Sequence, residues 1–136
     1  MTRNDELEFF IVSSSVSSLL GSPGQANYST ANALLDGLVA QRKARGLPAT
    51  GINFGPWAQG GMASSEAAVA NIGAQGLVPL EPTAALNALG EVVANGTGQA
   101  TVLKANWQRA AKMLGSTRPP ILDLVLPSAF GDATGD

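Results

Sequence analysis

The 136-residue chain contains no histidine and no cysteine. Without cysteine, disulfides, iron–sulfur clusters and thiolate zinc sites are excluded. Without histidine, the chain has no imidazole base, no Ser-His-Asp triad and none of the commonest ligands of transition metals. Any proton chemistry must therefore use a carboxylate, a lysine or Tyr28, the single tyrosine.

Charged residues are also sparse, at 13% of the chain, with 8 basic against 10 acidic side chains. This balance gives no basic surface of the kind that binds nucleic acid, so nucleic acid is not an expected partner. The one cluster of cations, Arg42, Lys43 and Arg45, comes just before Gly46. Cations at the end of a helix stabilise its negative pole, and a phosphate or partner site is the alternative interpretation of this cluster.

Long hydrophobic runs of the kind that cross membranes are missing. The apolar run Phe9–Val12 follows an acidic N-terminus and is far too short for a signal sequence or a membrane span. We therefore expect a cytoplasmic protein that does not enter a membrane. The apolar fraction of 45% is ordinary, and 136 residues suffice for one folded domain.

The pattern of apolar residues predicts strands that alternate with helices. Between 25 and 45 the apolar positions recur at helical spacing and form one stripe, made of Ala31, Leu34, Leu35, Leu38 and Val39. Strands are predicted over 9–14, 49–54 and 100–105, and helices over 25–45, 65–72, 82–95 and 106–114. This order predicts an α/β fold with a doubly wound parallel sheet.

Two further features concern the ends of the predicted fold. No G-x-G-x-x-G loop for cofactor phosphates follows the first strand. Residues 116–136 are rich in Pro and Gly and are predicted to be a linker or tail, in which Ile121–Leu126 is a candidate docking strand.

Polar residues cluster where the predicted strands end, which is where sites form in open α/β sheets. Three serines, Ser13 to Ser15, end the first strand, and Tyr28 and Asn32 share one face of the following helix. A tyrosine beside a strand-end serine forms an acid and donor pair for a carbonyl oxygen. The alternative is a half-buried tyrosine beside an ordinary serine-rich turn.

The motifs along residues 7–115 resemble one known family. Phe9 to Ser15 reads Phe-Phe-Ile-Val-Ser-Ser-Ser, and Gly21 to Tyr28 reads Gly-Ser-Pro-Gly-Gln-Ala-Asn-Tyr. Ile52 to Trp57 reads Ile-Asn-Phe-Gly-Pro-Trp. These motifs resemble the C-terminal half of a ketoreductase domain of a modular type I polyketide synthase, a branch of the short-chain dehydrogenase/reductase superfamily. The resemblance implies the second half of a Rossmann-like fold, over residues 1–115, with a helical lid.

That resemblance implies NADPH-dependent reduction of a 3-ketoacyl chain carried by an acyl carrier protein in polyketide or lipid biosynthesis. Ser15 and Tyr28 match the catalytic serine and tyrosine, and Asn32 matches the Asn of the family's Tyr-x-x-x-Asn pattern. The implied cofactor-binding residues are Tyr28, Asn53, Phe54, Gly55, Pro56 and Trp57. Residues 60–80 match a lid, and the implied substrate-binding residues are Leu20, Pro23, Gln25, Asn27, Gly61 and Met62. For Asn53 a tie at the strand end, and for Trp57 a place in the core, are equally good interpretations.

The resemblance also predicts the stereochemical class. A-type domains of the family have Trp eight residues before the tyrosine, where this chain has Leu20. B-type domains have Pro five residues before it and Asn one before, here Pro23 and Asn27. The chain therefore resembles the B-type, which gives a D-configured 3-hydroxyacyl product.

The chain departs from the family in what it lacks. The phosphate loop and the catalytic lysine belong to the family's first half, and no lysine precedes Lys43, which is expected on the surface. We therefore expect a fragment that is inactive alone and needs the missing N-terminal half of the domain, or the rest of a synthase. The alternatives are a non-catalytic structural or interaction fragment of a broken synthase reading frame, and a generic small-ligand-binding module. Without a partner, the strand over 9–14 is predicted to leave an open apolar edge that self-associates.

Overall fold

The computed structural model describes residues 2–58, 65–115 and 119–126. Its strands are β1 Ile11–Ser15, β2 Thr50–Phe54, β3 Leu77–Val78, β4 Gln99–Val102 and β5 Lys104–Ala105. Its α-helices are α1 Ser17–Leu20, α2 Ala26–Ala44, α3 Glu66–Ala74, α4 Pro82–Ala94 and α5 Trp107–Leu114. Two short 3-10 helices, Thr2–Asn4 and Pro120–Leu122, lie near the ends of the described chain.

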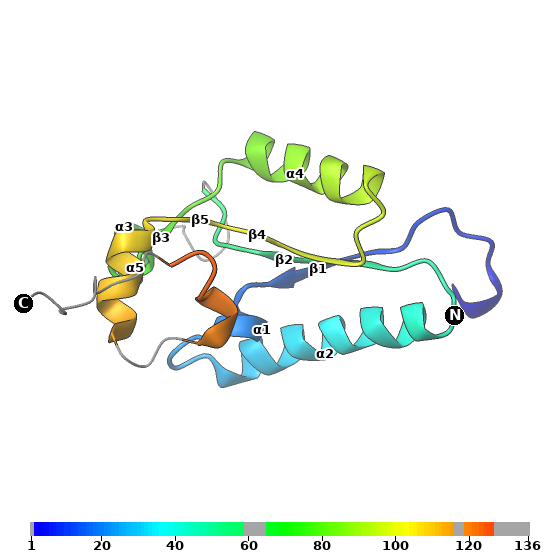
Figure 1. Cartoon of the computed structure of the whole chain (residues 1–136), viewed down its shortest axis with the longest axis horizontal. Helices are drawn as coiled ribbons and strands as arrows, with labels where there is room; N and C mark the ends of the chain where they lie inside the picture. The colour runs from blue at the N-terminus through cyan, green and yellow to red at the C-terminus, as the bar shows by residue number, and fades with distance from the viewer. Residues whose placement is uncertain (1, 59–64, 116–118, 127–136) are drawn as a thin grey trace, which may run out of the picture.

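The central sheet has the order β1-β2-β4 and all of its strands run parallel. In its register Ser14 is opposite Asn53, and Asn53 is opposite Thr101. α2 covers one face of this sheet and α4 covers the other, which gives three layers (Figure 1). The predicted α/β fold with a parallel sheet is confirmed.

The helix boundaries follow from local chemistry. α4 begins with Pro82 at its first turn, where the missing N–H of proline is harmless. α5 begins after Asn106, whose side-chain oxygen accepts a hydrogen bond from the backbone N–H of Arg109 at 3.0 Å. α2 ends just before Gly46, whose φ of +70° suits a helix C-terminus. These three signals are visible in the sequence, and the helices begin and end within two residues of the predicted positions.

Some elements differ from the prediction. The single strand predicted over 100–105 is divided into β4 and β5, and β5 pairs antiparallel with β3, which was not predicted. Ile121–Leu126 is not a strand; it forms the 3-10 helix Pro120–Leu122 and a turn. It does dock, because Leu122 and Leu126 are buried against α5.

The main apolar core lies between the sheet and α4. Ile52, Phe54, Leu80 and Ala85 are buried together, and Trp57, Leu89, Val92 and Val102 pack against them. Alternate residues of β2 therefore point toward α4, which leaves Gly51 and Asn53 on the face toward α2.

The face of α2 that contacts the sheet is mostly polar. The buried residues of this helix are Asn32, Val39 and Arg42, whereas Leu34 is 72% exposed. Leu35 and Leu38 are also exposed, so only Val39 of the apolar stripe predicted for this helix is buried. The reason is that the sheet presents Ser14, Gly51 and Asn53 here, and polar partners satisfy these groups where leucine would not.

Arg42 is buried and holds the N-terminal segment. Its Nε donates to the carbonyl oxygen of Pro48 at 3.2 Å, and its Nη1 donates to Thr2 Oγ1 at 2.9 Å. Its guanidinium carbon lies 4.0 Å from the centre of the Phe10 ring. This side chain therefore acts in packing as well as at the end of the helix.

β1 is an edge strand of the described sheet, and Phe9 and Ile11 beside that edge are exposed. We expect the isolated chain to self-associate through this edge, because unpaired backbone groups next to apolar side chains are a template for pairing. Multi-angle light scattering measures the effect, and Ile11→Lys is expected to shift the population toward monomer. A monodisperse monomer with rapid amide exchange along β1 would contradict this prediction.

Candidate functional site

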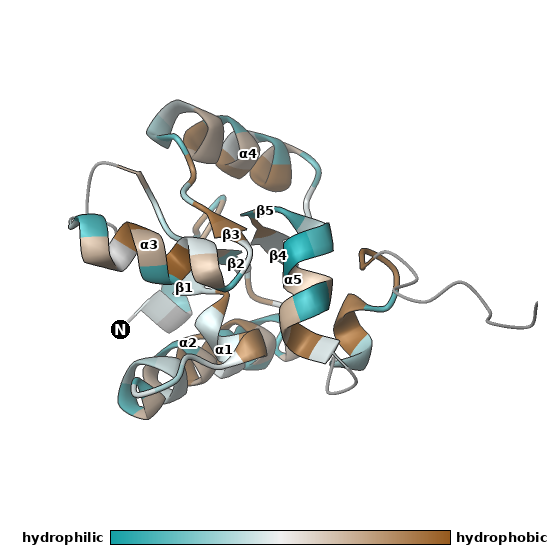
Figure 2. Cartoon of the chain, turned by 90° about the vertical axis from the view of Figure 1, so that its left-hand side faces the viewer, coloured by the Kyte–Doolittle hydropathy of each residue, from teal (hydrophilic) through white to brown (hydrophobic). Residues whose placement is uncertain are grey.

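A cleft of about 1320 Å³ lies beyond the carboxyl ends of β1 and β2. Figure 2 views this end of the molecule, with α3 on one side, α5 on the other and α1 below. The end of β1, the turn before α2, the segment after β2, α3 and α5 all contribute to its lining. Sites of open α/β sheets occur at this position.

Ser15 is the last residue of β1 and lines the cleft. Its Oγ accepts a hydrogen bond from the backbone N–H of Ser17 at 3.2 Å, at the start of α1. Because this bond uses an acceptor lone pair, the hydroxyl proton of Ser15 is available to a ligand in the cleft. The chain leaves the sheet directly after Ser15 and enters the short helix α1, so this serine stays at the end of the strand.

Tyr28 lies in the first turn of α2 and also lines the cleft, with 39% of its surface exposed. Asn32 is buried one turn later, and its Nδ2 donates to the carbonyl oxygen of Tyr28 at 2.9 Å. The structure therefore brings Ser15 and Tyr28 to one cleft. It places Asn32 behind Tyr28, outside the cleft lining.

Five residues at the end of β2 and just after it were predicted to contact a cofactor. Four of them line the cleft: Phe54, Gly55, Pro56 and Trp57. The rings of Phe54 and Trp57 meet edge to face at 5.2 Å. Trp57 is partly buried against the α4 core and also lines the cleft. It therefore combines the two interpretations, a place in the core and a place at the site. Asn53 is fully buried and is not in the lining.

The predicted substrate residues divide in the same way. Leu20, Pro23 and Gln25 line the cleft, whereas Asn27 is exposed on α2 and does not. Gly61 and Met62 lie outside the described residues.

One wall of the cleft was missed in the sequence. It is formed by α5 and the segment after it, with Trp107, Ala110, Met113, Leu114 and Leu122 in the lining. Trp107, Ala110 and Leu114 recur at helical spacing, so an apolar stripe was visible. Its position over the cleft depends on the β3–β5 pairing, which no local pattern predicts.

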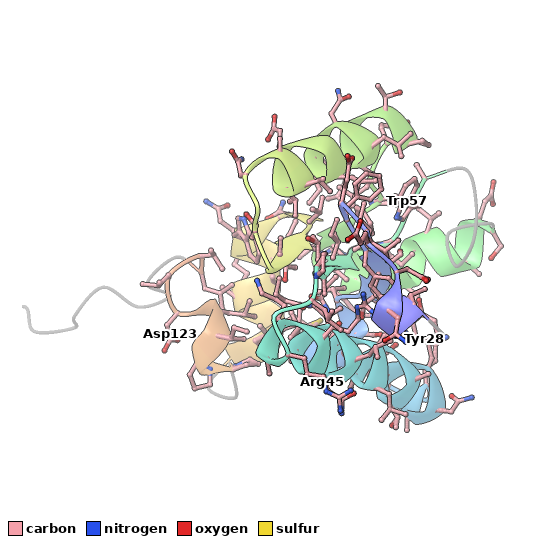
Figure 3. The ribbon with its side chains drawn as sticks, turned by 90° about the vertical axis from the view of Figure 1, so that its right-hand side faces the viewer. Tyr28, Arg45, Trp57 and Asp123 are labelled. Carbon is pink, nitrogen blue, oxygen red and sulfur yellow. The ribbon has the colours of Figure 1, made fainter. Side chains whose placement is uncertain are left out.

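The cleft is uncharged: none of its described lining residues is Asp, Glu, Lys or Arg. Arg45 projects from the far end of α2, away from the cleft (Figure 3). Within the described ranges no group of three or more carboxylates could hold a metal ion. The described lining therefore offers an uncharged acid and hydrogen-bond donors.

The described lining offers a nicotinamide ring both a polar group and an apolar surface. The Oγ of Ser17 is buried in the cleft lining and has no hydrogen-bond partner, so it is a polar group that a ligand can satisfy. Phe54, Gly55, Pro56 and Trp57 add apolar lining against which a ring can pack. Cofactor phosphates find no cation in the described lining, so these residues fit the nicotinamide end alone.

Within the described chain, no helix is long and apolar enough to cross a membrane.

Comparisons with known proteins give one consistent answer. The KR domain model matches residues 1–59. Polyketide synthase GfsB of Streptomyces halstedii is 42% identical over 118 residues, which are 87% of this chain and 2% of the synthase. GfsA of the same organism is 41% identical over 128 residues, 94% of this chain and 2% of the synthase.

Solved structures agree with the sequence matches. A-type ketoreductases from a modular polyketide synthase superpose with a TM-score of 0.82 at 32% identity, covering 94% of this chain and 26% of that chain. The first ketoreductase of the tylosin synthase gives 0.77 at 37% identity, covering 87% of this chain and 26% of that one. The chain thus spans a small part of each relative. It belongs to the ketoreductase domains of modular polyketide synthases, within the short-chain dehydrogenase/reductase superfamily.

Proposed function

We propose that this chain is the catalytic half of a ketoreductase that reduces a 3-ketoacyl thioester on an acyl carrier protein to the 3-hydroxyacyl thioester, using NADPH. One observation carries the proposal: Ser15 and Tyr28, from different elements, line one uncharged cleft at the strand ends. Their placement fits the family to which the chain belongs.

In the proposed reaction Tyr28 is the acid. A reduced nicotinamide held against Phe54 to Trp57 would supply the hydride for the carbonyl carbon. As the C=O π bond breaks, its electron pair moves to oxygen, which takes the proton of the Tyr28 hydroxyl. The Ser15 hydroxyl donates a hydrogen bond to the same oxygen and stabilises its developing charge.

Asn32 contacts the backbone of Tyr28, the proposed acid. Its side chain donates to the backbone carbonyl oxygen of Tyr28 within the first turns of α2, and so helps to fix the backbone that carries the phenol. A cation close to the phenol helps to stabilise the phenolate left by proton transfer. We propose that a lysine from the domain's other half supplies this cation.

We propose a B-type, D-configured product, based on Leu20, Pro23 and Asn27. The overall fold does not distinguish the classes. Solved ketoreductases described as A-type, A1-type and C2-type match with TM-scores of 0.82, 0.82 and 0.74. The prediction therefore depends on the local residues before Tyr28.

The open edge of β1 and the exposed leucines of α2 are the proposed contact with the other half of the domain. Leu34, Leu35 and Leu38 lie on a helix that packs against β1. Adjacent apolar side chains and unpaired strand groups fit a further strand and its helix. Self-association is then the result when that half is absent.

Joining this chain to the cofactor-binding first half of a related ketoreductase tests the function. We expect the 136-residue chain alone to bind no NADPH. The joined protein is expected to reduce a 3-ketoacyl pantetheine thioester, with a D-configured product by chiral chromatography.

Two outcomes would contradict parts of this proposal. A joined protein that binds NADPH but reduces nothing favours the alternative of a non-catalytic structural or interaction fragment. Reduction by the 136-residue chain alone would show that the other half is dispensable.

A further inference from the structure

A partly buried polar network joins α2 to the sheet beneath the cleft. Its centre is the Asp36 carboxylate, half-buried on α2. Asp36 Oδ2 accepts from Ser18 Oγ at 2.6 Å and from Asn53 Nδ2 at 2.8 Å, and Asp36 Oδ1 accepts from Gln99 Nε2 at 3.2 Å. Gln99 also donates to Asn53 Oδ1. We call Ser18, Asp36, Asn53 and Gln99 the Asp36 network.

The network is connected to the turn that carries Tyr28. Asn53 Nδ2 lies 3.3 Å from Ser14 Oγ, and Ser14 Oγ donates to the carbonyl oxygen of Asn32 at 3.2 Å. Asn32 in turn donates to the carbonyl oxygen of Tyr28 at 2.9 Å. Asn53 Nδ2 also donates to Ser18 Oγ at 2.9 Å. An amide nitrogen has two hydrogens, so Asn53 donates mainly to Asp36 and Ser18, and its longer contact with Ser14 is weaker.

The same network reaches the catalytic serine. Ser18 Oγ lies 2.8 Å from the carbonyl oxygen of Ser15, and Asn53 Nδ2 lies 3.4 Å from that oxygen. The Ser18 hydroxyl has a single proton, which Asp36 and the carbonyl oxygen of Ser15 share, so the backbone of Ser15 is coupled to the Asp36 network through Ser18. The two groups proposed to act on the carbonyl oxygen share one anchor.

Apolar packing does little to fix the position of α2 along the sheet. Val39 is buried, but the leucines of the stripe are exposed. Apolar contacts are non-directional, whereas charge-assisted hydrogen bonds are short and fix geometry. The Asp36 network therefore gives this helix directional contacts with the sheet, in addition to the hydrogen bonds made by Asn32 and Arg42.

A missing side chain at Gly51 leaves room for the network. A Cβ placed there would lie 2.9 Å from Gln99 Cδ and would overlap the end of that side chain. With no side chain at position 51, the end of Gln99 lies over this glycine, where it contacts Asp36 and Asn53.

We propose that Asp36 and Asn53 are positioning residues, which fix the positions of Tyr28 and Ser15 relative to each other through the Asp36 network. This rests on the proposed function, in which Tyr28 is the proton donor. Asn53 then acts from within the sheet and not as a cofactor contact. The structure brings together five elements here, because β1, β2, β4, α1 and α2 all contribute a polar group.

Tyr28 itself reports the test, because it is the only tyrosine. Incorporation of 3-fluorotyrosine gives one ¹⁹F NMR signal from the 136-residue chain. In Asp36→Asn we expect that signal to shift and broaden or split, at a temperature where far-UV circular dichroism shows an unchanged helix content. Ser18→Ala removes one hydrogen-bond donor to Asp36 without changing the charge, and we expect a smaller change of the same kind in the Tyr28 signal. This variant replaces Asp36→Asn in the test if Asp36→Asn does not fold.

Two controls separate positioning from stability. Val39→Ala lowers stability on the same helix without touching the network, and it is expected to leave the Tyr28 signal in place. Glu91→Gln removes an exposed carboxylate on α4 and is expected to change nothing. A Tyr28 signal that is unchanged in Asp36→Asn, or equally changed in Val39→Ala, would overturn the proposal.

Activity gives a second and independent readout. In the joined protein, Asp36→Asn is expected to lower kcat by about 10²-fold with KM nearly unchanged, as for a misplaced catalytic group. A changed Tyr28 signal with no reduction by the unsubstituted joined protein would contradict the proposed function and support the positioning role. Normal reduction by Asp36→Asn would contradict positioning and support the function.

Discussion

Replacing Tyr28 by phenylalanine is expected to lower ketone reduction by about 10²–10⁴-fold, the usual contribution of a positioned general acid. The substitution removes one hydroxyl and keeps the ring, and the side chain is already 39% exposed. Folding and NADPH binding should therefore change little. The measurement is kcat/KM of the joined protein, followed by the absorbance of the reduced nicotinamide.

Thr30→Val is the matched control for Tyr28→Phe. Thr30 is exposed on the same helix, and this change also removes a single hydroxyl while it keeps the shape of the side chain. It is expected to leave kcat/KM within twofold. If Tyr28→Phe kept more than a tenth of the activity, the phenol would not be the main acid.

Gly76→Ala is expected to reduce the free energy of unfolding by about 3 kcal/mol, through left-handed backbone strain and overpacking together. Gly76 has a φ of +76°, and a Cβ there would lie 2.7 Å from the backbone nitrogen of Ala110. Its carbonyl oxygen also accepts from the N–H of Asn106 at 2.8 Å, at the start of α5. Because α5 forms one wall of the cleft, the substitution should disturb the cleft as well as the fold. Urea denaturation measures the change.

Gly46→Ala separates the two causes. Gly46 has nearly the same backbone conformation, with φ of +70°, but a Cβ there meets no atom within 4 Å. We expect a loss of about 1–2 kcal/mol from backbone strain alone. Equal losses in the two variants would mean that the contact with α5 relaxes freely.

Much of the fold could be predicted because its signals are local. Pro82, Gly46 and the run from Phe9 mark the boundaries of helices and strands through chemistry that involves only neighbouring residues. The alternation of strand and helix then implies a parallel sheet, and a parallel sheet places the strand ends together. This is why Ser15, Tyr28 and the residues from Phe54 could be placed at one site.

What could not be predicted depends on contacts between distant segments. Hydropathy indicates that the leucines of α2 are buried, yet the helix buries Asn32 and Arg42, because the sheet opposite carries serine, glycine and asparagine. The period of two along β2 separates Asn53 from Ile52 and Phe54, but it does not say which face each takes. The α5 wall was missed because the β3–β5 pairing that positions it involves two residues on each side.

The absence of a side chain at Gly51 limits which substitutions related sequences can accept at positions 51 and 99. A Cβ at 51 would overlap the end of the Gln99 side chain, although the two positions are 48 apart in sequence (99 − 51). Replacement of Gly51 therefore requires the end of Gln99 to move or residue 99 to shorten, and either change disturbs the contacts of Gln99 with Asp36 and Asn53. The two positions form a linked pair, in which a substitution at one alters the constraints on the other.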